Sequence, residues 1–310
     1  GGALYKIKKI LKKDFLLING DTYFDINISV LLENKFRNNL CTIALTSNNK
    51  YKKNIKINNI NINKNNLIVF PNDGTNLMNG GIYFCKKEIF KFIVKKKCSF
   101  EDDILKKLII KKKIHGIIFK EKFIDIGSHK TIKFLIKNKG FLKQKAIFLD
   151  RDGVINKLKN NDYIKNYKEF KFLPGVIEGI KYINKINYLV IIITNQACIG
   201  KGIINEKNLD TIHFKMKQHL KLKKNAYIND IYYSPYYEFS KNSKYKMNKF
   251  DRKPNPGMLI KAVKKWNIDT KKSLFIGDNI TDCISSKAVK IKFYYKSNLK
   301  LISQLKKIIQ

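Results

Sequence analysis

A short apolar run that ends in two acidic residues constrains the fold of this chain more than any other feature. Within residues 145–156, an apolar run leads directly to Asp150 and Asp152, and Gly153 follows. Such a run, bounded by a glycine, is typical of a buried strand that opens into a loop. In open α/β sheets, ligands bind and functional residues lie at the carboxyl ends of such strands. The spacing suits a division of labour in which Asp150 attacks phosphorus and Asp152 handles the leaving-group proton.

Two later apolar runs, at 188–193 and 273–276, also end in polar residues. The residues that follow them are Thr194, Asn195 and Gln196 in the first case, and Gly277, Asp278 and Asp282 in the second. Hydroxyl and amide groups of this kind can hold phosphoryl oxygens. A basic pair, Arg252 and Lys253, lies between the two runs and is followed by Pro254, a poor residue for a helix interior. The second half of the chain therefore predicts strands that each deliver polar groups to one edge of a sheet.

Taken in order, these segments resemble the motifs of the haloacid dehalogenase-like phosphohydrolases, which are Asp-x-Asp, Thr, Lys and Gly-Asp-x-x-x-Asp. A lone Asp-x-Asp pair is common as a solvated loop cap, whereas the full set in order, each after a plausible strand, is specific. The resemblance implies a Rossmann-like α/β domain with a parallel sheet over residues 145–310. It also implies that Asp150 forms an aspartyl-phosphate and that Asp152 serves as acid and then as base.

The same resemblance implies a magnesium site. Mg2+ is expected on Asp150, the backbone carbonyl of Asp152 and Asp278, an all-oxygen set of the kind that this ion prefers. Asp282 is expected to orient Asp278 or Lys253 and not to bind the metal directly. The residues expected to bind the transferring phosphoryl group are Thr194 and Lys253.

Longer motifs surround these residues. They are Asp-Arg-Asp-Gly-Val-Ile-Asn at 150–156, Thr-Asn-Gln at 194–196 and Arg-Lys-Pro-Asn-Pro-Gly-Met at 252–258. They resemble the D-glycero-D-manno-heptose 1,7-bisphosphate 7-phosphatases, whose relatives are the histidinol-phosphate phosphatases. The resemblance implies that Asn195, Gln196 and Arg252 contact the substrate, a small sugar phosphate.

One segment departs from the pattern of this family. Its members usually carry a zinc loop of Cys and His before the Arg-Lys pair, whereas residues 234–251 contain neither residue type. A tetrahedral zinc site needs such ligands. We therefore expect no zinc, and a loop that is held by its tyrosines and by packing.

The first half of the chain has acidic residues at two strand ends. Apolar runs lead to Asp21 and to Asp125, and the two carboxylates could hold one divalent ion between them. Further motifs are Gly-Gly-Ala at 1–3, Asn-Gly-Gly-Ile-Tyr at 79–83 and Ser-Phe-Glu-Asp-Asp at 99–103. Together they resemble sugar-1-phosphate nucleotidyltransferases, particularly those that make GDP-mannose or GDP-heptose. The resemblance implies a mixed sheet with helices over residues 1–140.

In that family the residues that match Asp21 and Asp125 bind the catalytic Mg2+. The resemblance further implies that Asn79, Gly81 and Glu101 approach the sugar. The family also carries a Gly-rich phosphate loop with an essential Arg, and no equivalent precedes Asp21. Without it the backbone N–H cradle for a triphosphate is missing. We therefore expect either that the sequence is a fragment or that this half is a structural remnant. As it stands, this half is not expected to transfer nucleotides, and there is little basis for nucleotide binding.

The charge of the chain has a simple explanation. Lys and Arg number 64 against 24 Asp and Glu, a formal net charge of +40. The lysines are scattered along every segment and accompany heavy use of Ile and Asn, so we interpret them as a compositional bias and expect no specific nucleic-acid partner. A positive field would still help to recruit anionic sugar phosphates.

Other features indicate a cytoplasmic protein with no membrane partner. The five cysteines show no close pairing, no secretory signal precedes them, and no apolar run is long enough to span a bilayer. The four histidines, His213 among them, are interpreted as structural or surface residues. The Asn- and Lys-rich stretch at 48–66 is expected to form an exposed hairpin or loop, and 137–145 is expected to join the two domains.

The sequence predicts a Mg2+-dependent phosphatase that removes the 7-phosphate of heptose bisphosphate in lipopolysaccharide or capsule sugar biosynthesis. The product, heptose 1-phosphate, is what a guanylyltransferase would activate next. A phosphatase half and a nucleotidyltransferase-like half on one chain would thus belong to consecutive steps, which favours this substrate. Two alternatives stay open: a phosphatase for histidinol phosphate or another small phosphomonoester, and a non-catalytic scaffold.

Overall fold

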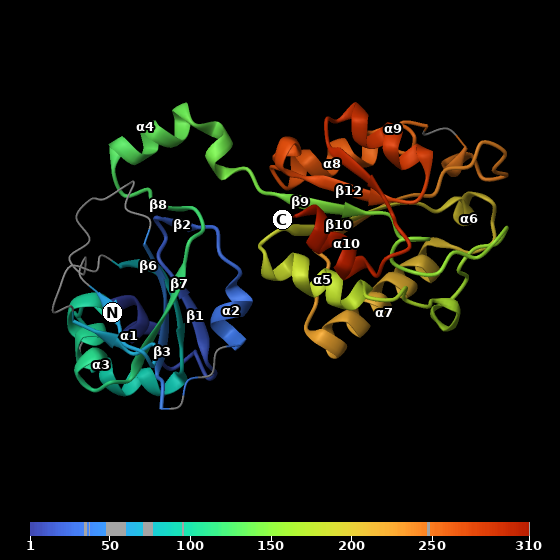
Figure 1. The fold of residues 1–310 in the computed structure, drawn as a ribbon. Helices are drawn as coiled ribbons and strands as arrows, with labels where there is room; N and C mark the ends of the chain where they lie inside the picture. Colours follow the sequence, from blue (N-terminus) through green and yellow to red (C-terminus); the bar gives the residue numbers. More distant parts are fainter. Residues whose placement is uncertain are drawn as a thin grey trace. The chain divides into compact units, whose positions relative to one another are not determined.

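The computed structural model describes most of the chain as two compact units, which are considered separately (Figure 1). The described residues are 1–33, 36, 38–47, 60–70, 77–94, 96–246 and 249–309. The units comprise residues 1–138 and 139–310. None of the helices within the described ranges is long and apolar enough to cross a membrane.

The first unit is built on a mixed sheet of four strands, in the order β1-β6-β3-β7. Strands β3 and β7 are parallel, and the other neighbours are antiparallel. The strands are β1 (Phe15–Ile18), β2 (Thr22–Phe24), β3 (Cys41–Thr46), β4 (Asn61–Ile62), β5 (Ile68–Val69), β6 (Met78–Cys85), β7 (Ile114–Phe119) and β8 (Phe123–Asp125). The helices are α1 (Gly2–Ile7), α2 (Ile28–Glu33), α3 (Lys106–Ile110) and α4 (His129–Lys137).

Two short antiparallel pairs lie outside the main sheet of this unit, β2 with β8 and β4 with β5. The first pair sets Thr22 opposite Asp125 and so brings together the two acidic segments of the sequence. The second pair is a hairpin that contains the described end of the Asn- and Lys-rich stretch, whose residues 48–59 lie outside the described ranges. The antiparallel pair β2-β8 therefore joins the segments that carry Asp21 and Asp125.

The second unit is a three-layer α/β structure around a parallel sheet of five strands. The strands are β9 (Ala146–Leu149), β10 (Leu189–Asn195), β11 (Asp230–Ser234), β12 (Leu274–Gly277) and β13 (Lys292–Tyr295). The helices are α5 (Val176–Lys185), α6 (Ala197–Gly200), α7 (Glu206–Lys224), α8 (Gly257–Lys265), α9 (Ile280–Ala288) and α10 (Leu301–Ile308). The predicted parallel sheet is thus present.

Helices cover both faces of the central strand, β9, which is why its sequence is an unbroken apolar run. On one face, Ile147 and Leu149 pack in a core with residues of α5, α7 and α10. On the other face, Ala146 and Phe148 pack with residues of α8. Figure 1 shows α5, α7 and α10 on one side of the sheet and α8 on the other.

The strand order places a crevice at the carboxyl end of β9. The order is β11-β10-β9-β12-β13, so the chain builds one side of the sheet first and then crosses to the other side of β9. Ligands of open α/β sheets bind at such a switch point, outside the carboxyl ends of the strands. The segments that leave β9, β10 and β12 therefore meet at one site.

Candidate active site

Asp150 occupies the switch point, directly after β9. Its backbone N–H donates to the carbonyl of Ile276 in β12 at 3.0 Å, so the sheet fixes its position. Its carboxylate accepts a hydrogen bond from the N–H of Arg151 at 2.7 Å and lies 3.0 Å from Nζ of Lys253. Burial raises the pKa of Asp150 above its ordinary value, while Lys253 opposes this shift. A cation beside the carboxylate favours the ionised form that a nucleophile needs.

Lys253 is a fully satisfied buried cation, with 4% of its surface exposed. Its ammonium group lies 3.0 Å from Asp150 Oδ1 and 2.5 Å from Asp282 Oδ1. It also donates to the carbonyl of Ile193 at 3.0 Å. Because an ammonium has three protons, these acceptors use all of them. Burial alone would lower the pKa of Lys253, but the two carboxylates raise it above its ordinary value.

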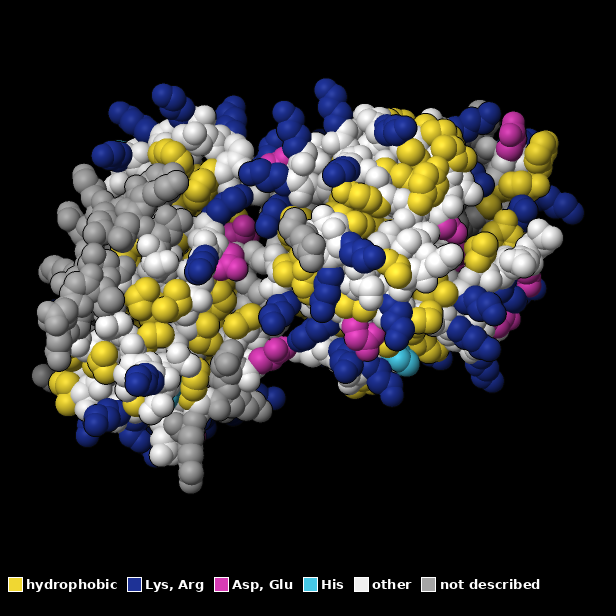
Figure 2. Space-filling view, viewed as in Figure 1, with side chains coloured by type: hydrophobic (Ala, Val, Ile, Leu, Met, Phe, Trp, Pro, Cys, Tyr) yellow, Lys and Arg dark blue, Asp and Glu magenta, His cyan; other side chains and the backbone are white. Residues whose placement is uncertain are grey.

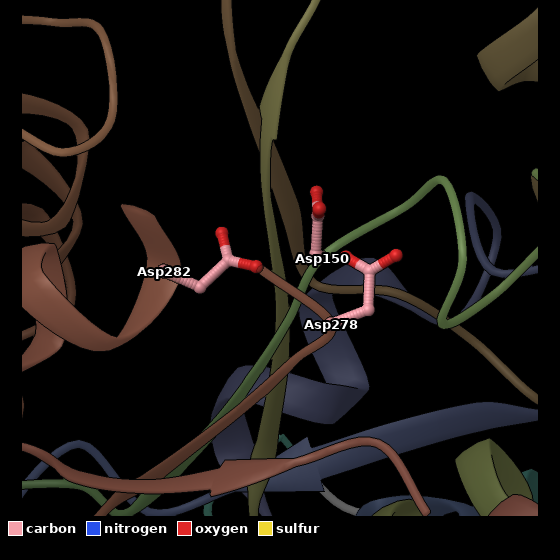
Figure 3. A group of neighbouring side chains, drawn as sticks. All are labelled: Asp150, Asp278 and Asp282. Carbon is pink, nitrogen blue, oxygen red and sulfur yellow. The ribbon is translucent and has the colours of Figure 1, made fainter. Parts of the chain in front are cut away.

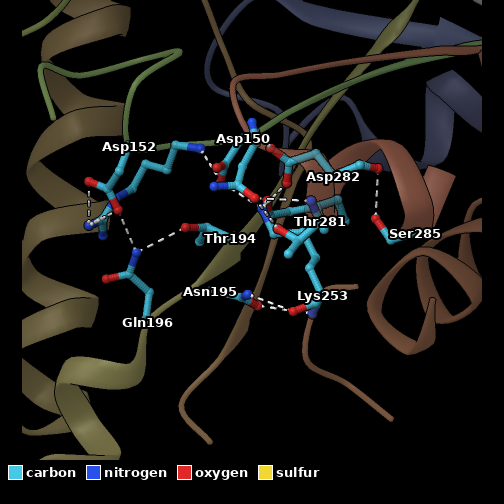
Figure 4. Close-up of polar contacts among 12 residues, drawn as sticks. Asp150, Asp152, Thr194, Asn195, Gln196, Lys253, Thr281, Asp282 and Ser285 are labelled. Carbon is cyan, nitrogen blue, oxygen red and sulfur yellow. Dashed lines mark hydrogen bonds and ion pairs between the residues drawn. The ribbon is translucent and has the colours of Figure 1, made fainter. Parts of the chain in front are cut away.

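The amide of Asn195 positions Lys253 through its backbone (Figure 4). The side-chain NH2 of Asn195 donates to the carbonyl of Lys253 at 3.0 Å, and the N–H of Lys253 donates back to Asn195 Oδ1 at 3.1 Å. The neighbouring Arg252 donates to the carbonyl of Tyr236 at 3.0 Å. The amide of Asn195 thus holds the basic pair in place, and its predicted contact with the substrate stays a prediction.

Asp152 is held by a set of donors on the other side of Asp150. Arg151 donates to both of its carboxylate oxygens, at 3.0 and 2.8 Å. Asn156 donates to Oδ1 at 2.9 Å, and Gln196 donates to Oδ2 at 2.8 Å. Burial alone would raise the pKa of Asp152, but Arg151 and these amides outweigh it and hold the pKa below its ordinary value. The carboxylate is therefore kept ionised.

Gln196 links Asp152 to Thr194. Its NH2 group donates to Asp152 and, at 2.9 Å, to the hydroxyl oxygen of Thr194, which is 1% exposed (Figure 4). Since the Thr194 oxygen accepts this bond, its own O–H remains available as a donor. The side chain of Gln196 therefore orients two neighbouring groups, and its predicted contact with the substrate stays a prediction.

His213 on α7 completes this arrangement, although nothing in the sequence motifs singled it out. Nη1 of Arg151 lies 3.3 Å from Nε2 of His213, and both side chains are buried. Arginine can only donate, so His213 must accept through Nε2 as a neutral imidazole. Burial, assisted by the Arg151 charge, lowers the pKa of His213 to about 3. The predicted structural role of His213 agrees with this contact, and the role is to orient the guanidinium that holds Asp152.

We expect His213→Leu to lower the free energy of unfolding by about 1–3 kcal/mol, because it leaves a buried guanidinium N–H without an acceptor. His213→Gln, which keeps an acceptor, should lose less. In the wild type the unfolded state takes up a proton below about pH 6.5 whereas native His213 stays neutral to about pH 3, so stability should fall as the pH decreases through this window.

Urea unfolding at pH 7 and pH 5 measures both effects. His219→Gln, on the same helix, is the matched control. It should change neither the free energy of unfolding nor its dependence on pH appreciably. A His213→Leu variant with the same free energy of unfolding as the wild type, and the same dependence on pH, would show that the contact with Arg151 does not stabilise the fold.

The carboxylates of Asp150, Asp278 and Asp282 form an acidic cluster (Figure 3). One oxygen of each lies within 4.8 Å of the others, and no second group of this kind occurs within the described ranges. The Asp282 carboxylate is buried, pairs with Lys253 and caps α9 by accepting from the N–H of Asn279 at 3.1 Å. Asp282 therefore touches Lys253, one of the two partners expected for it.

The cluster fits a small divalent cation. Burial and the charge of Asp282 raise the pKa of Asp278, and the charge of Lys253 offsets only part of this shift. Gly153 has a φ of +85°, and a Cβ at this position would lie 1.9 Å from Asp278 Oδ2, so only glycine lets the loop pass beside this carboxylate. Close oxygen ligands from acidic residues are what Mg2+ prefers. Asp150 and Asp278 are thus suited to hold it.

The acidic residues of the first unit are also neighbours. A Cβ on Gly127 would lie 2.9 Å from Asp125 Oδ1 and 3.3 Å from Asp21 Oδ2, so the two carboxylates face the same small space. Asp125 Oδ1 accepts from the N–H of Gly127 at 2.7 Å. The structure therefore brings Asp21 and Asp125 together within the first unit.

Asn79, Gly81 and Glu101 form a second connected group in this unit. Asn79 donates to Glu101 Oε1 at 3.2 Å and accepts from the N–H of Gly81 at 3.0 Å. Tyr83 belongs to the motif at 79–83, although no role was predicted for it; its hydroxyl accepts from Asn79 at 2.7 Å and donates to Glu101 at 3.1 Å. Gly81 has a φ of +69°, and a Cβ there would lie 2.7 Å from the hydroxyl of Thr22. This group therefore lies next to the β2 strand.

The segment 234–251, where a loop without zinc was predicted, has aromatic contacts among its described residues, which exclude 247 and 248. The hydroxyl of Tyr245 donates to Glu206 at 2.9 Å, and its carbonyl accepts from the N–H of Tyr237 at 3.0 Å. The rings of Tyr237 and Phe239 meet edge to face at 5.7 Å. Tyrosines therefore tie this segment to the start of α7.

Comparison with known proteins shows the family. The model of a family described as polynucleotide kinase 3 phosphatase matches residues 145–301. A D-glycero-beta-D-manno-heptose-1,7-bisphosphate 7-phosphatase from Rhodopseudomonas palustris is 34% identical over 149 residues, 48% of this chain and 81% of that protein. The chain belongs to the haloacid dehalogenase-like phosphatases. A D-glycero-alpha-D-manno-heptose-1,7-bisphosphate 7-phosphatase from Photorhabdus laumondii is 39% identical over 140 residues, 45% of this chain and 75% of that protein.

A solved structure is also similar to this phosphatase. It is the D,D-heptose 1,7-bisphosphate phosphatase from B. bronchiseptica in complex with magnesium and phosphate, at 22% identity and a TM-score of 0.46, covering 54% of this chain and 99% of that chain. The predicted similarity to heptose bisphosphate phosphatases is confirmed by the curated relatives. The similarity of the first unit to nucleotidyltransferases stays a prediction.

Proposed function

We propose that this phosphatase removes the 7-phosphate of D-glycero-D-manno-heptose 1,7-bisphosphate in a Mg2+-dependent reaction. The observation that carries the proposal is the convergence of Asp150, Lys253 and Asp278 at the switch point of the sheet. The named relatives support the substrate, and they include both the alpha and the beta form of the sugar. The anomer is therefore left open.

In this mechanism Asp150 attacks the phosphorus atom, and the bond to the sugar oxygen breaks as the aspartyl-phosphate forms. Lys253 keeps Asp150 ionised, and the free O–H of Thr194 donates to a phosphoryl oxygen. When bound, Mg2+ would be held by Asp150, Asp278 and the backbone carbonyl of Asp152, and it would neutralise charge on the phosphoryl oxygens.

Asp152 supplies the proton transfers. Its low pKa suits the second half of the reaction, in which an ionised carboxylate takes a proton from the water that attacks the aspartyl-phosphate. In the first half, the negative charge of the bound phosphate raises the pKa of Asp152, which favours a protonated carboxyl that can donate to the leaving oxygen. The contacts from Arg151 and Gln196 hold the group in place for both steps.

Phosphate release from different substrates tests the proposal. We expect kcat/KM for heptose 1,7-bisphosphate to exceed that for histidinol phosphate by about 100-fold, because polar groups of the sugar are recognised individually. Removal of Mg2+ by EDTA should abolish the activity, and added Mg2+ should restore it. A preference for histidinol phosphate would support the alternative substrate. An absence of Mg2+-dependent activity on every phosphomonoester tried would instead favour the scaffold.

A further inference from the structure

The arginine of the Asp-Arg-Asp motif is buried. Many lysine and arginine side chains stand out from the face of the second unit that Figure 2 shows, whereas Arg151 is 1% exposed. An arginine next to the nucleophile would be a natural phosphate ligand, because its planar guanidinium matches the oxygens of a phosphate. The burial of Arg151 indicates a different role.

The guanidinium of Arg151 is shared between two partners. Nε and Nη2 donate to the carboxylate of Asp152 through three contacts of 3.3, 3.0 and 2.8 Å. Nη1 lies 3.3 Å from Nε2 of His213, which accepts because arginine can only donate. One line of contacts therefore runs from His213 through Arg151 to Asp152. The first two side chains are buried, whereas 24% of the Asp152 side chain is exposed.

The hydrophobic core fixes the inner end of this line. His213 lies on the buried stripe of α7 with Ile212 and Met216, and both of these side chains belong to the core on one face of the sheet. The ring of His213 also lies 6.1 Å from the ring of Tyr233 in β11. A side chain in a close-packed interior has little room to move. His213 is therefore a fixed acceptor for Arg151.

The loss of this acceptor would displace Asp152. A guanidinium is planar and rigid, so its N–H groups turn together when one of them seeks a new acceptor. The N–H groups that hold Asp152 would turn as well. Asn156 and Gln196 hold the carboxylate from other directions, so it would shift but not come free. A displacement of about 1 Å at a catalytic group costs on the order of 100-fold in rate.

We propose that His213 is a positioning residue for proton transfer, which acts by fixing Arg151 and, through it, the carboxyl of Asp152. The inference rests on the proposed phosphatase function and adds a residue that lies outside the motifs. As the bond from Asp150 to phosphorus forms, the bond from phosphorus to the sugar oxygen breaks. That oxygen keeps the electron pair and takes the proton of Asp152. Only a leaving oxygen that needs this proton should depend on His213.

Two substrates with different leaving groups test this role. A sugar oxygen leaves poorly without a proton, whereas p-nitrophenolate is a stable anion and leaves without one. We expect His213→Leu to lower kcat/KM for heptose 1,7-bisphosphate by about 10-fold to 100-fold, while kcat/KM for p-nitrophenyl phosphate stays within about threefold of the wild type. His213→Gln, which keeps an acceptor, should recover most of the loss. The comparison uses kcat/KM because this parameter covers the formation of the aspartyl-phosphate and not its hydrolysis.

A variant without the acid shows whether His213 acts through Asp152. In Asp152→Asn the proton donor is absent, so adding His213→Leu should lower kcat/KM for the bisphosphate by less than about twofold further. Ile212→Val is the matched control, because it removes core packing at the neighbouring position of α7 but no hydrogen bond. It should leave the ratio of the two kcat/KM values unchanged. Circular dichroism at the assay temperature confirms that each variant is folded.

The outcomes separate this inference from the proposed function. An equal loss on both substrates would show that His213 only stabilises the fold, and an unchanged kcat/KM for the bisphosphate would show that Asp152 keeps its place without it. A full further loss in the Asp152→Asn background would show that His213 does not act through Asp152. Each of these results overturns the inference and leaves the phosphatase function standing. If the wild type hydrolyses neither substrate in the presence of Mg2+, the proposed function fails and the inference fails with it.

Discussion

Replacing Asp150 by Asn is expected to lower kcat for phosphate release by about 10,000-fold or more, because the amide cannot form the aspartyl-phosphate. Asn has nearly the same shape as Asp, and its side-chain oxygen can still accept from the N–H of Arg151. Lys253 keeps its contacts with Asp282 and with the carbonyl of Ile193. The variant should therefore fold and bind substrate.

Single-turnover assays with heptose 1,7-bisphosphate measure the loss, and acid quenching should trap phosphorylated wild type but no phosphorylated variant. Asp210→Asn, an exposed position on α7, is the matched control and should retain full activity. An Asp150→Asn protein that still releases phosphate at more than a hundredth of the wild-type rate would exclude Asp150 as the nucleophile.

Replacing Lys253 by Met is expected to affect both stability and activity. The change leaves the buried carboxylates of Asp150 and Asp282 without their shared cation, and breaking a buried ion pair from one side costs about 3–5 kcal/mol. Because Lys253 also contacts the nucleophile, kcat should fall by about 100-fold to 1,000-fold. Urea unfolding and phosphate release measure the two effects.

A second variant separates the two roles of Lys253. Lys253→Met/Asp282→Asn removes one of the unpaired charges and should recover part of the lost stability, but not the lost activity. Lys265→Met is the control, because its ion pair with Asp230 is exposed on the lysine side, and it should cost less than about 1 kcal/mol. If Lys253→Met has the same free energy of unfolding as Lys265→Met, the three acceptors around Lys253 stabilise the fold no more than an exposed ion pair does.

The motifs predicted several of the residues that the structure brings together at the candidate active site, because their placement depends on local sequence. Each of the strands β9, β10 and β12 is a short apolar run, and a parallel sheet brings the carboxyl ends of such runs to one edge. Asp150, Thr194 and Asp278 could therefore be identified from position alone. Gly153 belongs to the same motif because only glycine fits beside Asp278.

The contacts around these residues could not be predicted in this way. The motifs did not predict that Asn195 pairs with the backbone of Lys253, or that Gln196 donates to Asp152. His213 lies on a helix whose pattern indicates only packing, and its contact with Arg151 depends on how that helix seats on the sheet. The same holds for Tyr83 in the first unit, which joins Asn79 to Glu101 across the strand and the helical turn.

By itself the sequence determined the strands, their polar ends and the residue types available for phosphoryl transfer, because apolar runs and turn residues act over a few neighbouring positions. Only the tertiary structure decided which donors hold Asp152, which acceptors surround Lys253, and which buried side chain accepts from Arg151. These contacts join segments far apart in the chain. Their partners are chosen by packing of helices and loops on the sheet, and no local pattern encodes that choice.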